Sequence, residues 1–130
     1  MLNLNNRQTS QKILIVEDNE DLTRILEMHL KHLGYHTLPA KNGKQALDLA
    51  ASERPDLITL DITLPDMDGL EVARSIRQNS KTQGIPILAV TARFLPEDRA
   101  QCIQGGCNDY ISKPFTFSHL ASRIENLLNC

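Results

Sequence analysis

Short runs of mostly apolar residues recur along the chain, and the segments between them have apolar residues at helical spacing. Leu57–Leu60 shows the strand pattern most clearly, because it lies between turn-forming residues and has no regular polar alternation. A run of this kind is typical of a strand buried on both faces of a parallel sheet. The five predicted strands are Lys12–Val16, Tyr35–Ala40, Leu57–Leu60, Ile85–Thr91 and Asp109–Ser112.

A helix is expected after each of these strands, because apolar residues in those segments recur at intervals of three and four. Gly34 ends the first helix and Gly69 opens the third. Pro96 suits the first turn of the fourth helix, where its missing N–H costs nothing, and Gly105-Gly106 ends that helix. The positions expected to face the core are Leu22, Ile25, Leu26, Leu30 and Leu33, then Ala46, Leu47 and Ala50, then Leu70, Ala73 and Ile76, and finally Phe117, Leu120, Ile124 and Leu127.

Five alternating strand–helix units predict one α/β domain, a doubly wound, five-stranded parallel sheet with helices on both faces. Because crossovers between parallel strands are right-handed, few topologies remain, and the strand order 2-1-3-4-5 is one of the two common ones. The domain is expected to span residues 12–130. Residues 1–11 are polar and rich in asparagine, which predicts a disordered N-terminal tail.

Composition and charge exclude several classes of function. The chain has 130 residues, a net charge of -2 and no apolar run near the roughly 20 residues that span a membrane. These values give no electrostatic case for a nucleic-acid partner and none for a membrane span. The first residues lack an apolar signal segment, so the protein is expected to be cytoplasmic. Cys102, Cys107 and Cys130 are odd in number and lack metal-binding spacing, which favours reduced structural thiols.

Polar residues stand where four of the predicted strands end. The first strand runs into Glu17 and Asp18, and the third, fourth and fifth end at Asp61, Thr91 and Lys113. Taken singly, each has an ordinary explanation as a helix-end acid, a turn aspartate, a β-former or a solvated charge. Because the carboxyl ends of parallel strands share one edge of the sheet, where ligands bind in open α/β sheets, we expect one site.

The predicted site combines three carboxylates, a hydroxyl and an ammonium group. Carboxylates that are packed together repel each other, and a divalent cation relieves that repulsion. Oxygen ligands with open water positions suit Mg²⁺ (or Mn²⁺). A carboxylate nucleophile beside such a cation, with Lys113 and Thr91 nearby, indicates aspartyl phosphate chemistry at Asp61.

Four motifs carry a resemblance to a known family. They are Val16-Glu-Asp-Asn19, Leu60-Asp-Ile-Thr-Leu-Pro-Asp-Met-Asp-Gly69, Val90-Thr-Ala92 and Asp109-Tyr-Ile-Ser-Lys-Pro-Phe115. From about Lys12 to Leu128 the chain resembles the receiver domain of bacterial response regulators, the family of the chemotaxis regulator. The resemblance implies a flavodoxin-like (βα)5 fold. It also implies a phosphorylatable switch of a two-component phosphorelay rather than an enzyme with an external product.

The resemblance assigns roles to the residues at the strand ends. Asp61 would be the phospho-acceptor, taking its phosphoryl group from a phosphohistidine. Asp18, Asp61 and the backbone carbonyl of Thr63 would bind Mg²⁺ directly, and Glu17 would act through water. Lys113 would contact the phosphoryl group.

Further residues are assigned to the switch and to its lifetime. Thr91 would bond to the phosphoryl group after phosphorylation, and Tyr110 would be the rotameric partner of that movement. Ala92 would leave room for the phosphoryl group. Thr63 and Arg93 would tune the attack of water on the aspartyl phosphate, so that the domain assists its own autodephosphorylation.

Two kinds of partner are implied by the same resemblance. One is a histidine kinase or phosphotransfer protein, and the other is a downstream protein target. The target, or a second copy in a phosphorylation-dependent dimer, is expected on the surface of the fourth helix from near Pro96, the fifth strand, and the fifth helix from near Thr116. Arg99 and Arg123 are expected to contribute to its specificity. A cis Lys113–Pro114 bond is implied as well.

Two other functions are weaker alternatives. A phosphohydrolase of the haloacid dehalogenase type also uses an aspartate, Mg²⁺, a threonine and a lysine, but needs a second aspartate where this chain has Thr63. A flavodoxin-like FMN carrier needs a phosphate-binding loop after the first strand, where the acidic Glu17-Asp18-Asn19 would repel phosphate. The histidines are scattered and expected to be unpaired surface residues: His29, His32, His36 and His119.

Overall fold

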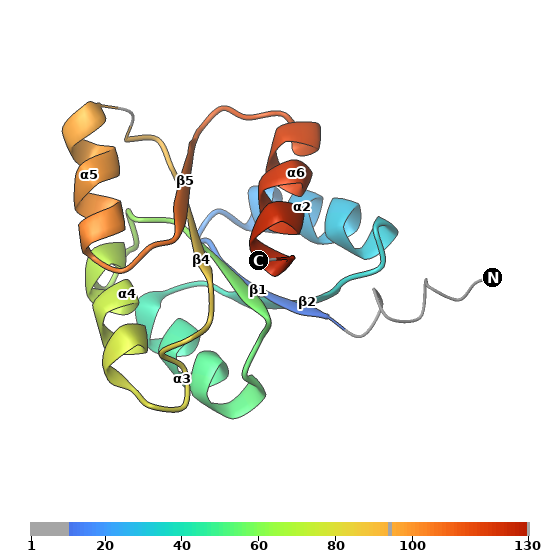
Figure 1. Cartoon of the computed structure of the whole chain (residues 1–130). Coiled ribbons are helices and arrows are strands. Elements are labelled where there is room, and N and C mark those ends of the chain that lie inside the picture. Colours follow the sequence, from blue (N-terminus) through green and yellow to red (C-terminus); the bar gives the residue numbers. More distant parts are fainter. Residues whose placement is uncertain (1–10, 94, 130) are drawn as a thin grey trace.

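The computed structural model describes residues 11–93 and 95–129, which form one parallel sheet and the helices around it (Figure 1). The sheet order β2-β1-β3-β4-β5 confirms the predicted order 2-1-3-4-5. Of the predicted tail, residues 1–10 lie outside the described residues. The strands are β1 (Lys12–Val16), β2 (His36–Ala40), β3 (Leu57–Leu60), β4 (Ile87–Thr91) and β5 (Asp109–Ser112). The helices are α2 (Glu20–His32), α3 (Gly43–Glu53), α4 (Gly69–Gln78), α5 (Pro96–Gln104) and α6 (Phe117–Leu128).

The core has two layers, because successive residues of a strand point to opposite faces of the sheet. In β1, Ile13 and Ile15 pack with apolar residues of α2 and α6. Leu14 and Val16 pack instead in the cluster of α3, α4 and α5. Every residue of β3 is buried, as predicted from its mostly apolar run. The central strands therefore form a rigid floor, with helices on both sides (Figure 1).

Two strand boundaries and two core positions predicted from the sequence differ from the structure. Strand β4 begins at Ile87 rather than Ile85, because Pro86 has no N–H to donate, although its carbonyl accepts from Ile58 at 3.0 Å. Strand β2 begins after Tyr35, whose N–H still bonds to the end of α2. Two positions predicted to face the core are partly exposed, Ile25 by 40% and Leu33 by 45%. The buried stripe of α2 is therefore narrower than its apolar pattern.

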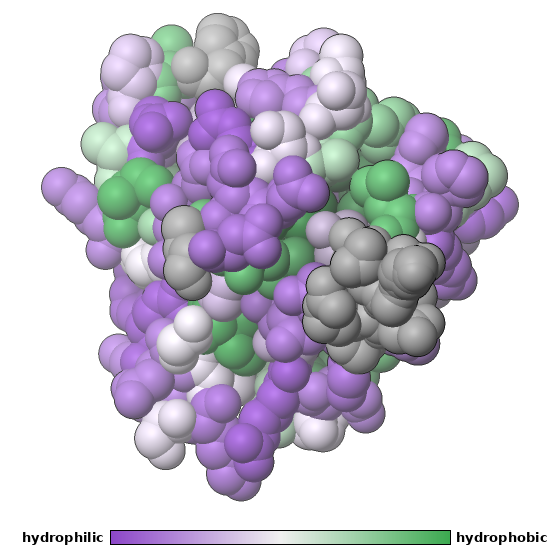
Figure 2. All heavy atoms as spheres, turned by 45° about the vertical axis from the view of Figure 1, so that its right-hand side comes forward, coloured by the Kyte–Doolittle hydropathy of each residue, from purple (hydrophilic) through white to green (hydrophobic). Residues whose placement is uncertain are grey.

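The surface over α2 and α6 is mostly hydrophilic, with small separate apolar patches (Figure 2). Along the described part of the chain, no helix is long and apolar enough to cross a membrane. Cys102 and Cys107 are buried and free, in agreement with the predicted reduced thiols, whereas Cys130 lies outside the described residues.

Short loops at the carboxyl ends of the strands lead directly into helices. Asn19 caps α2 by accepting a hydrogen bond from the Leu22 amide at 3.0 Å. Asp68 caps α4 in the same way through the Leu70 amide. The loops from β1 to α2 and from β3 to α4 therefore end in capped helices, and these loops contain Glu17, Asp18 and Asp61.

Candidate functional site

Three carboxylates meet at the carboxyl ends of β1 and β3. The strands are paired side by side, with Val16 opposite Leu60, so Glu17 and Asp61 leave the sheet together. The carboxylate oxygens of Glu17, Asp18 and Asp61 lie within 4.8 Å of one another. Glu17 is 4% exposed and Asp61 is 6% exposed, whereas Asp18 faces solvent. The cluster is therefore a negative pocket that opens on the side of Asp18.

Lys113 supplies the positive charge of this pocket. Its Nζ lies 2.8 Å from an oxygen of Glu17 and 3.2 Å from an oxygen of Asp61. Burial raises the pKa of Glu17, and the hydrogen bond from Lys113 only partly offsets that rise. Burial by itself would lower the pKa of Lys113, but the bond to Glu17 and the charge of Asp61 raise it overall. Lys113 is therefore a firmly protonated cation between two carboxylates.

The Asp61 carboxylate is fixed through both of its oxygens. Oδ1 accepts from the Thr63 amide at 2.9 Å, and Oδ2 accepts from Lys113. The loop behind it is packed tightly against the start of α4. A Cβ atom on Gly69 would stand 2.5 Å from the Cα of Ile62 and 2.7 Å from the carbonyl oxygen of Asp61. Gly69 is needed here for this close approach rather than for an unusual backbone angle, which the turn pattern alone did not indicate.

Thr91 lies at the end of β4, next to β3 in the sheet. Its side chain is fully buried, and its hydroxyl oxygen accepts a hydrogen bond from the Arg93 amide at 3.3 Å. The hydroxyl hydrogen is therefore available to a new acceptor. Ala92 and Thr63 are exposed, so neither blocks the approach to the pocket from solvent.

Two residues that support the site were missed from the sequence. The Asn19 amide donates to the second carboxylate oxygen of Glu17 at 3.1 Å, which orients that side chain. Asp66, in the loop after Asp61, accepts from the amides of Gly43 and Lys44 at 2.8 and 3.1 Å. An asparagine three residues before Leu22 does suggest a helix cap, but no local pattern links Asp66 to a helix 23 residues earlier.

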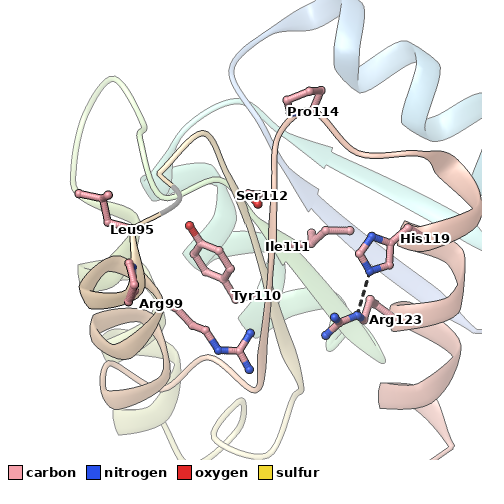
Figure 3. A pocket seen from close by; sticks show the side chains of 9 residues that line it. Leu95, Arg99, Tyr110, Ile111, Ser112, Pro114, His119 and Arg123 are labelled. Atoms are coloured by element: carbon pink, nitrogen blue, oxygen red, sulfur yellow. Dashed lines mark hydrogen bonds between the residues drawn. The ribbon is translucent and has the colours of Figure 1, made fainter.

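A groove of about 580 Å³ runs beside the site, over β5 and between α5 and α6 (Figure 3). Leu95 and Arg99 line it from the side of α5, and His119 and Arg123 line it from α6. Tyr110 points from β5 toward α5 (Figure 3) and is 7% exposed. Its hydroxyl is buried with no hydrogen-bond partner among the described residues, which is a costly arrangement for a polar atom.

The histidines are exposed, as predicted, but two of them have partners. The ring of His29 stacks on Phe117 with a centroid distance of 3.7 Å. His119 accepts a hydrogen bond from Arg123 at 3.3 Å, and Arg123 also binds both carboxylate oxygens of Asp109 at 2.7 Å. The expectation of unpaired histidines is therefore wrong for His29 and His119, because Phe117 stacks on the first and Arg123 donates to the second.

The donor set suits a hard divalent cation. Carboxylate oxygens are ligands that Mg²⁺ prefers, and the exposed side at Asp18 leaves room for water ligands. Two of the three carboxylates already share one ammonium, so a net negative charge remains for a cation to balance. The Lys113–Pro114 bond is cis, as expected. The arrangement can position a carboxylate nucleophile and stabilise added negative charge beside it.

Comparison with known proteins gives a consistent result for this fold and site. Residues 13–125 match the family model described as response regulator receiver domain. The chain is 40% identical over 118 residues to the polar-differentiation response regulator DivK of Brucella anthropi, covering 91% of this chain and 96% of that protein.

Solved structures show the same similarity in three dimensions. The receiver domain of the sensor histidine kinase PA1611 of Pseudomonas aeruginosa, which has a magnesium ion in its active site cleft, is 38% identical with a TM-score of 0.86. That alignment covers 92% of this chain and 98% of the other. The BeF3-activated receiver domain of RstA from Klebsiella pneumoniae is 29% identical with a TM-score of 0.85, covering 92% and 100% of the two chains.

Proposed function

The chain belongs to the family of response regulator receiver domains, and we propose from this membership that Asp61 is its phospho-acceptor. The domain is a phosphorylatable switch of two-component signalling, whose phosphoryl donor is a histidine kinase or a phosphotransfer protein. One observation supports the assignment above all. The Asp61 carboxylate is buried at the end of the central strand, with one oxygen bonded to the Thr63 amide and the other to Lys113.

The side chains can carry out the transfer as follows. A carboxylate oxygen of Asp61 attacks phosphorus, the bond from phosphorus to the donor histidine nitrogen breaks, and that nitrogen leaves with the electron pair. Lys113 lies where it balances the charge that accumulates on the phosphoryl oxygens. Mg²⁺, when bound, would add charge balance on the same oxygens. Asp18, Asp61 and the Thr63 carbonyl would bind it directly, with Glu17 contributing through water.

Phosphorylation is then passed on through Thr91. A phosphoryl group on Asp61 offers the buried Thr91 hydroxyl a charge-assisted hydrogen bond, which is stronger than its present bond to the Arg93 amide. Ala92 leaves space for the group. Movement of Thr91 changes the space beside Tyr110, whose hydroxyl gains by reaching a partner. The domain thus has two states, which differ in the rotamers of Thr91 and Tyr110. Phosphorylation shifts the population toward the state that binds the phosphoryl group better, and the difference in binding free energy sets the size of the shift.

The lifetime of the aspartyl phosphate depends on residues at the pocket entrance. Thr63 is exposed beside Asp61, and Arg93 is half-buried just beyond Thr91. Side chains at both positions control where water approaches phosphorus. The domain thus assists its own dephosphorylation without acting on an external substrate.

The output surface is the groove between α5 and α6, with β5 as its floor (Figure 3). Arg123 is neutralised by Asp109, whereas the exposed Arg99 has no ion pair within residues 11–93 and 95–129. A target with an acidic side chain beside an apolar one fits Arg99 and Leu95. We infer that the domain is a monomer or a phosphorylation-dependent dimer, and that a dimer would use the same surface. A phosphohistidine donor is consistent with a cytoplasmic location for this domain.

The decisive test is phosphorylation by acetyl phosphate in the presence of Mg²⁺, followed by intact mass. Wild type gains one phosphoryl group, and Asp61→Asn gains none while keeping the circular dichroism of the wild type. Asp68→Asn is the matched control, because Asp68 lies in the same loop outside the carboxylate cluster and asparagine also caps helices. Undiminished uptake by Asp61→Asn refutes the assignment.

A second measurement concerns the output surface. Beryllofluoride, a phosphoryl mimic, is expected to shift backbone amide resonances along residues 95–125 as well as in the pocket. Shifts confined to the pocket would place the output elsewhere. The reversal Arg99→Glu is expected to leave phosphorylation intact and to weaken the binding of the target or second copy.

A further inference from the structure

Helix α5 is anchored to the rest of the domain by a single buried side chain. That side chain is Cys102, which is 1% exposed, whereas every other described helix buries at least two residues. Ile103, a large apolar residue of α5, is 41% exposed. Because apolar burial is the main force that holds a helix on a sheet, α5 is the helix that opens at the lowest cost.

The turn after α5 brings Cys102 against a second buried cysteine, Cys107. The Cys107 amide donates to the Cys102 carbonyl at 2.9 Å, and the Gly106 amide donates to the Ile103 carbonyl at 3.2 Å. With Gly106 at a φ of 115°, these two bonds form a Schellman motif. In this motif the two residues joined by the bond that spans more of the chain, here Cys102 and Cys107, commonly contact each other through their side chains. Here both are thiols, and both are buried in the same core cluster.

The backbone of this turn is held from outside by Arg77 of α4. Its Nε donates to the Gly106 carbonyl at 3.0 Å, and its Nη2 donates to the Asn108 side chain at 2.7 Å. A Cβ atom on Gly106 would stand 2.8 Å from the Cγ of Arg77, so the arginine lies directly on the turn. The turn between the two cysteines is thus held by contacts in which neither thiol takes part.

We propose that Cys102 and Cys107 are a dithiol site, which closes to an intramolecular disulfide when the chain meets a small-molecule disulfide. One thiolate attacks a sulfur of the external disulfide, forming a mixed disulfide and releasing one external thiol. The second thiolate attacks the protein sulfur of that mixed disulfide, forming the Cys102–Cys107 bond and releasing the other external thiol. The two thiol protons go to the two released thiols, and the protein loses two electrons.

Burial makes this reaction depend on the opening of α5. It raises the pKa of Cys107 to about 12 and also raises that of Cys102, so both thiols stay protonated near neutral pH. Opening of α5 exposes Cys102 and restores its reactivity. Once formed, the bond fixes the last turn of α5 to the residue before Asn108 and β5, at the edge of the sheet remote from Asp61.

The test uses the full chain with Cys130→Ser, which removes the third thiol. The native protein is incubated with oxidised glutathione, quenched in acid, and alkylated in denaturant. The expected main product lacks two hydrogen atoms, carries neither alkyl groups nor glutathione, and regains two alkylatable thiols after reduction. Trypsin gives one peptide, residues 100–123, that contains both cysteines, because Lys113 precedes a proline. This peptide should show the same loss of two hydrogens.

The matched control is Cys107→Ser in the same background, which can form a glutathione adduct but cannot lose two hydrogens. Phosphorylation of the oxidised protein by acetyl phosphate should equal that of the reduced protein, which shows that the disulfide form is native. Glutathione adducts or linked dimers as the main product of the native chain would overturn the proposal. The proposal would also be overturned if the native chain kept two free thiols under a glutathione treatment that oxidises the same chain in denaturant.

Discussion

The two ends of the sheet carry polar clusters that are built in opposite ways. At the carboxyl end, Glu17, Asp18 and Asp61 face one ammonium, so negative charge is in excess. At the amino end of β4 and β5, the guanidinium of Arg77 donates to three backbone carbonyls and to the Asn108 side chain, at 2.7 to 3.0 Å. The carboxylates at the carboxyl end repel one another, whereas the guanidinium at the amino end has hydrogen-bond acceptors around it.

The two clusters therefore have different roles: one can bind ligands, and the other stabilises the fold. Burial lowers the pKa of Arg77, but a guanidinium remains charged, and four acceptors replace its water. The cluster therefore stabilises the loops before β4 and β5 without needing any ligand. The carboxylate cluster costs stability until a cation or a phosphoryl group arrives, and for that reason it can respond to them.

The largest expected effect tests the amino end. Arg77→Met should lower the free energy of unfolding by about 3 kcal/mol, because four hydrogen bonds from one charged group, two of them part-buried, are lost together. Arg74→Met is the control, since Arg74 is exposed on the same helix, and it should change stability by less than about 0.5 kcal/mol. Urea unfolding followed by circular dichroism measures both. Equal losses for the two variants would remove the contrast between the ends.

Metal binding tests the carboxyl end. Mg²⁺ at 100 times its dissociation constant should stabilise the wild type by about 2.7 kcal/mol, because it binds the folded cluster and not the unfolded chain. Asp18→Ala should lose most of this gain, and without metal it should be at least as stable as the wild type. Asp21→Ala, exposed on α2 outside the cluster, should keep the gain. Thermal unfolding with and without Mg²⁺ decides the matter, and an undiminished gain in Asp18→Ala would contradict the assigned ligand.

Two glycines compare backbone packing at the two ends. Gly69→Ala should destabilise the domain by about 2 kcal/mol and slow its phosphorylation, because the new methyl group pushes the Asp61–Ile62 backbone. Gly84→Ala, in the loop before β4, should be nearly neutral, since nothing lies within 4 Å of the added atom. Urea midpoints and acetyl phosphate kinetics measure both variants. A neutral Gly69→Ala would mean that the loop tolerates displacement.

The smallest effect is a pH dependence in the loop after Asp61. The hydrogen bond from the Gly43 amide holds the pKa of Asp66 below its ordinary value of 3.8. A lowered folded pKa means that the carboxylate stabilises the fold above the unfolded pKa, and that this contribution disappears as pH falls through the folded pKa. Asp66→Ala should therefore have a lower urea midpoint than the wild type near neutral pH, and the difference should shrink below pH 3.8.

Asp48→Ala provides the comparison for that experiment. Asp48 is exposed on α3 and pairs only with Lys44 at the surface, so its loss should have little effect on the midpoint at any pH. A difference between Asp66→Ala and the wild type that persists unchanged in acid would show that the carboxylate charge is not what stabilises this loop.

From the sequence alone, the strand order 2-1-3-4-5 was one of two common possibilities, and the members of the carboxylate cluster could be named. Strand patterns depend on residues that are close together in the chain, so Leu57–Leu60 could be placed from four residues and their flanking turns. Parallel strands bring their carboxyl ends to one edge, so Glu17, Asp61, Thr91 and Lys113 could be expected together although 96 residues separate the first from the last. Both inferences follow from chain geometry that does not depend on neighbouring helices.

Only the tertiary structure decided which polar and small residues support that edge and the opposite one. Arg77 and Asp66 bind backbone groups 6 to 29 and 22 to 23 residues away, and no local pattern marks such partners. The contact of Gly69 with the Asp61 backbone likewise depends on how a helix lies against a loop. Packing of this kind is specified by distances in the folded chain, which sequence periodicity does not encode.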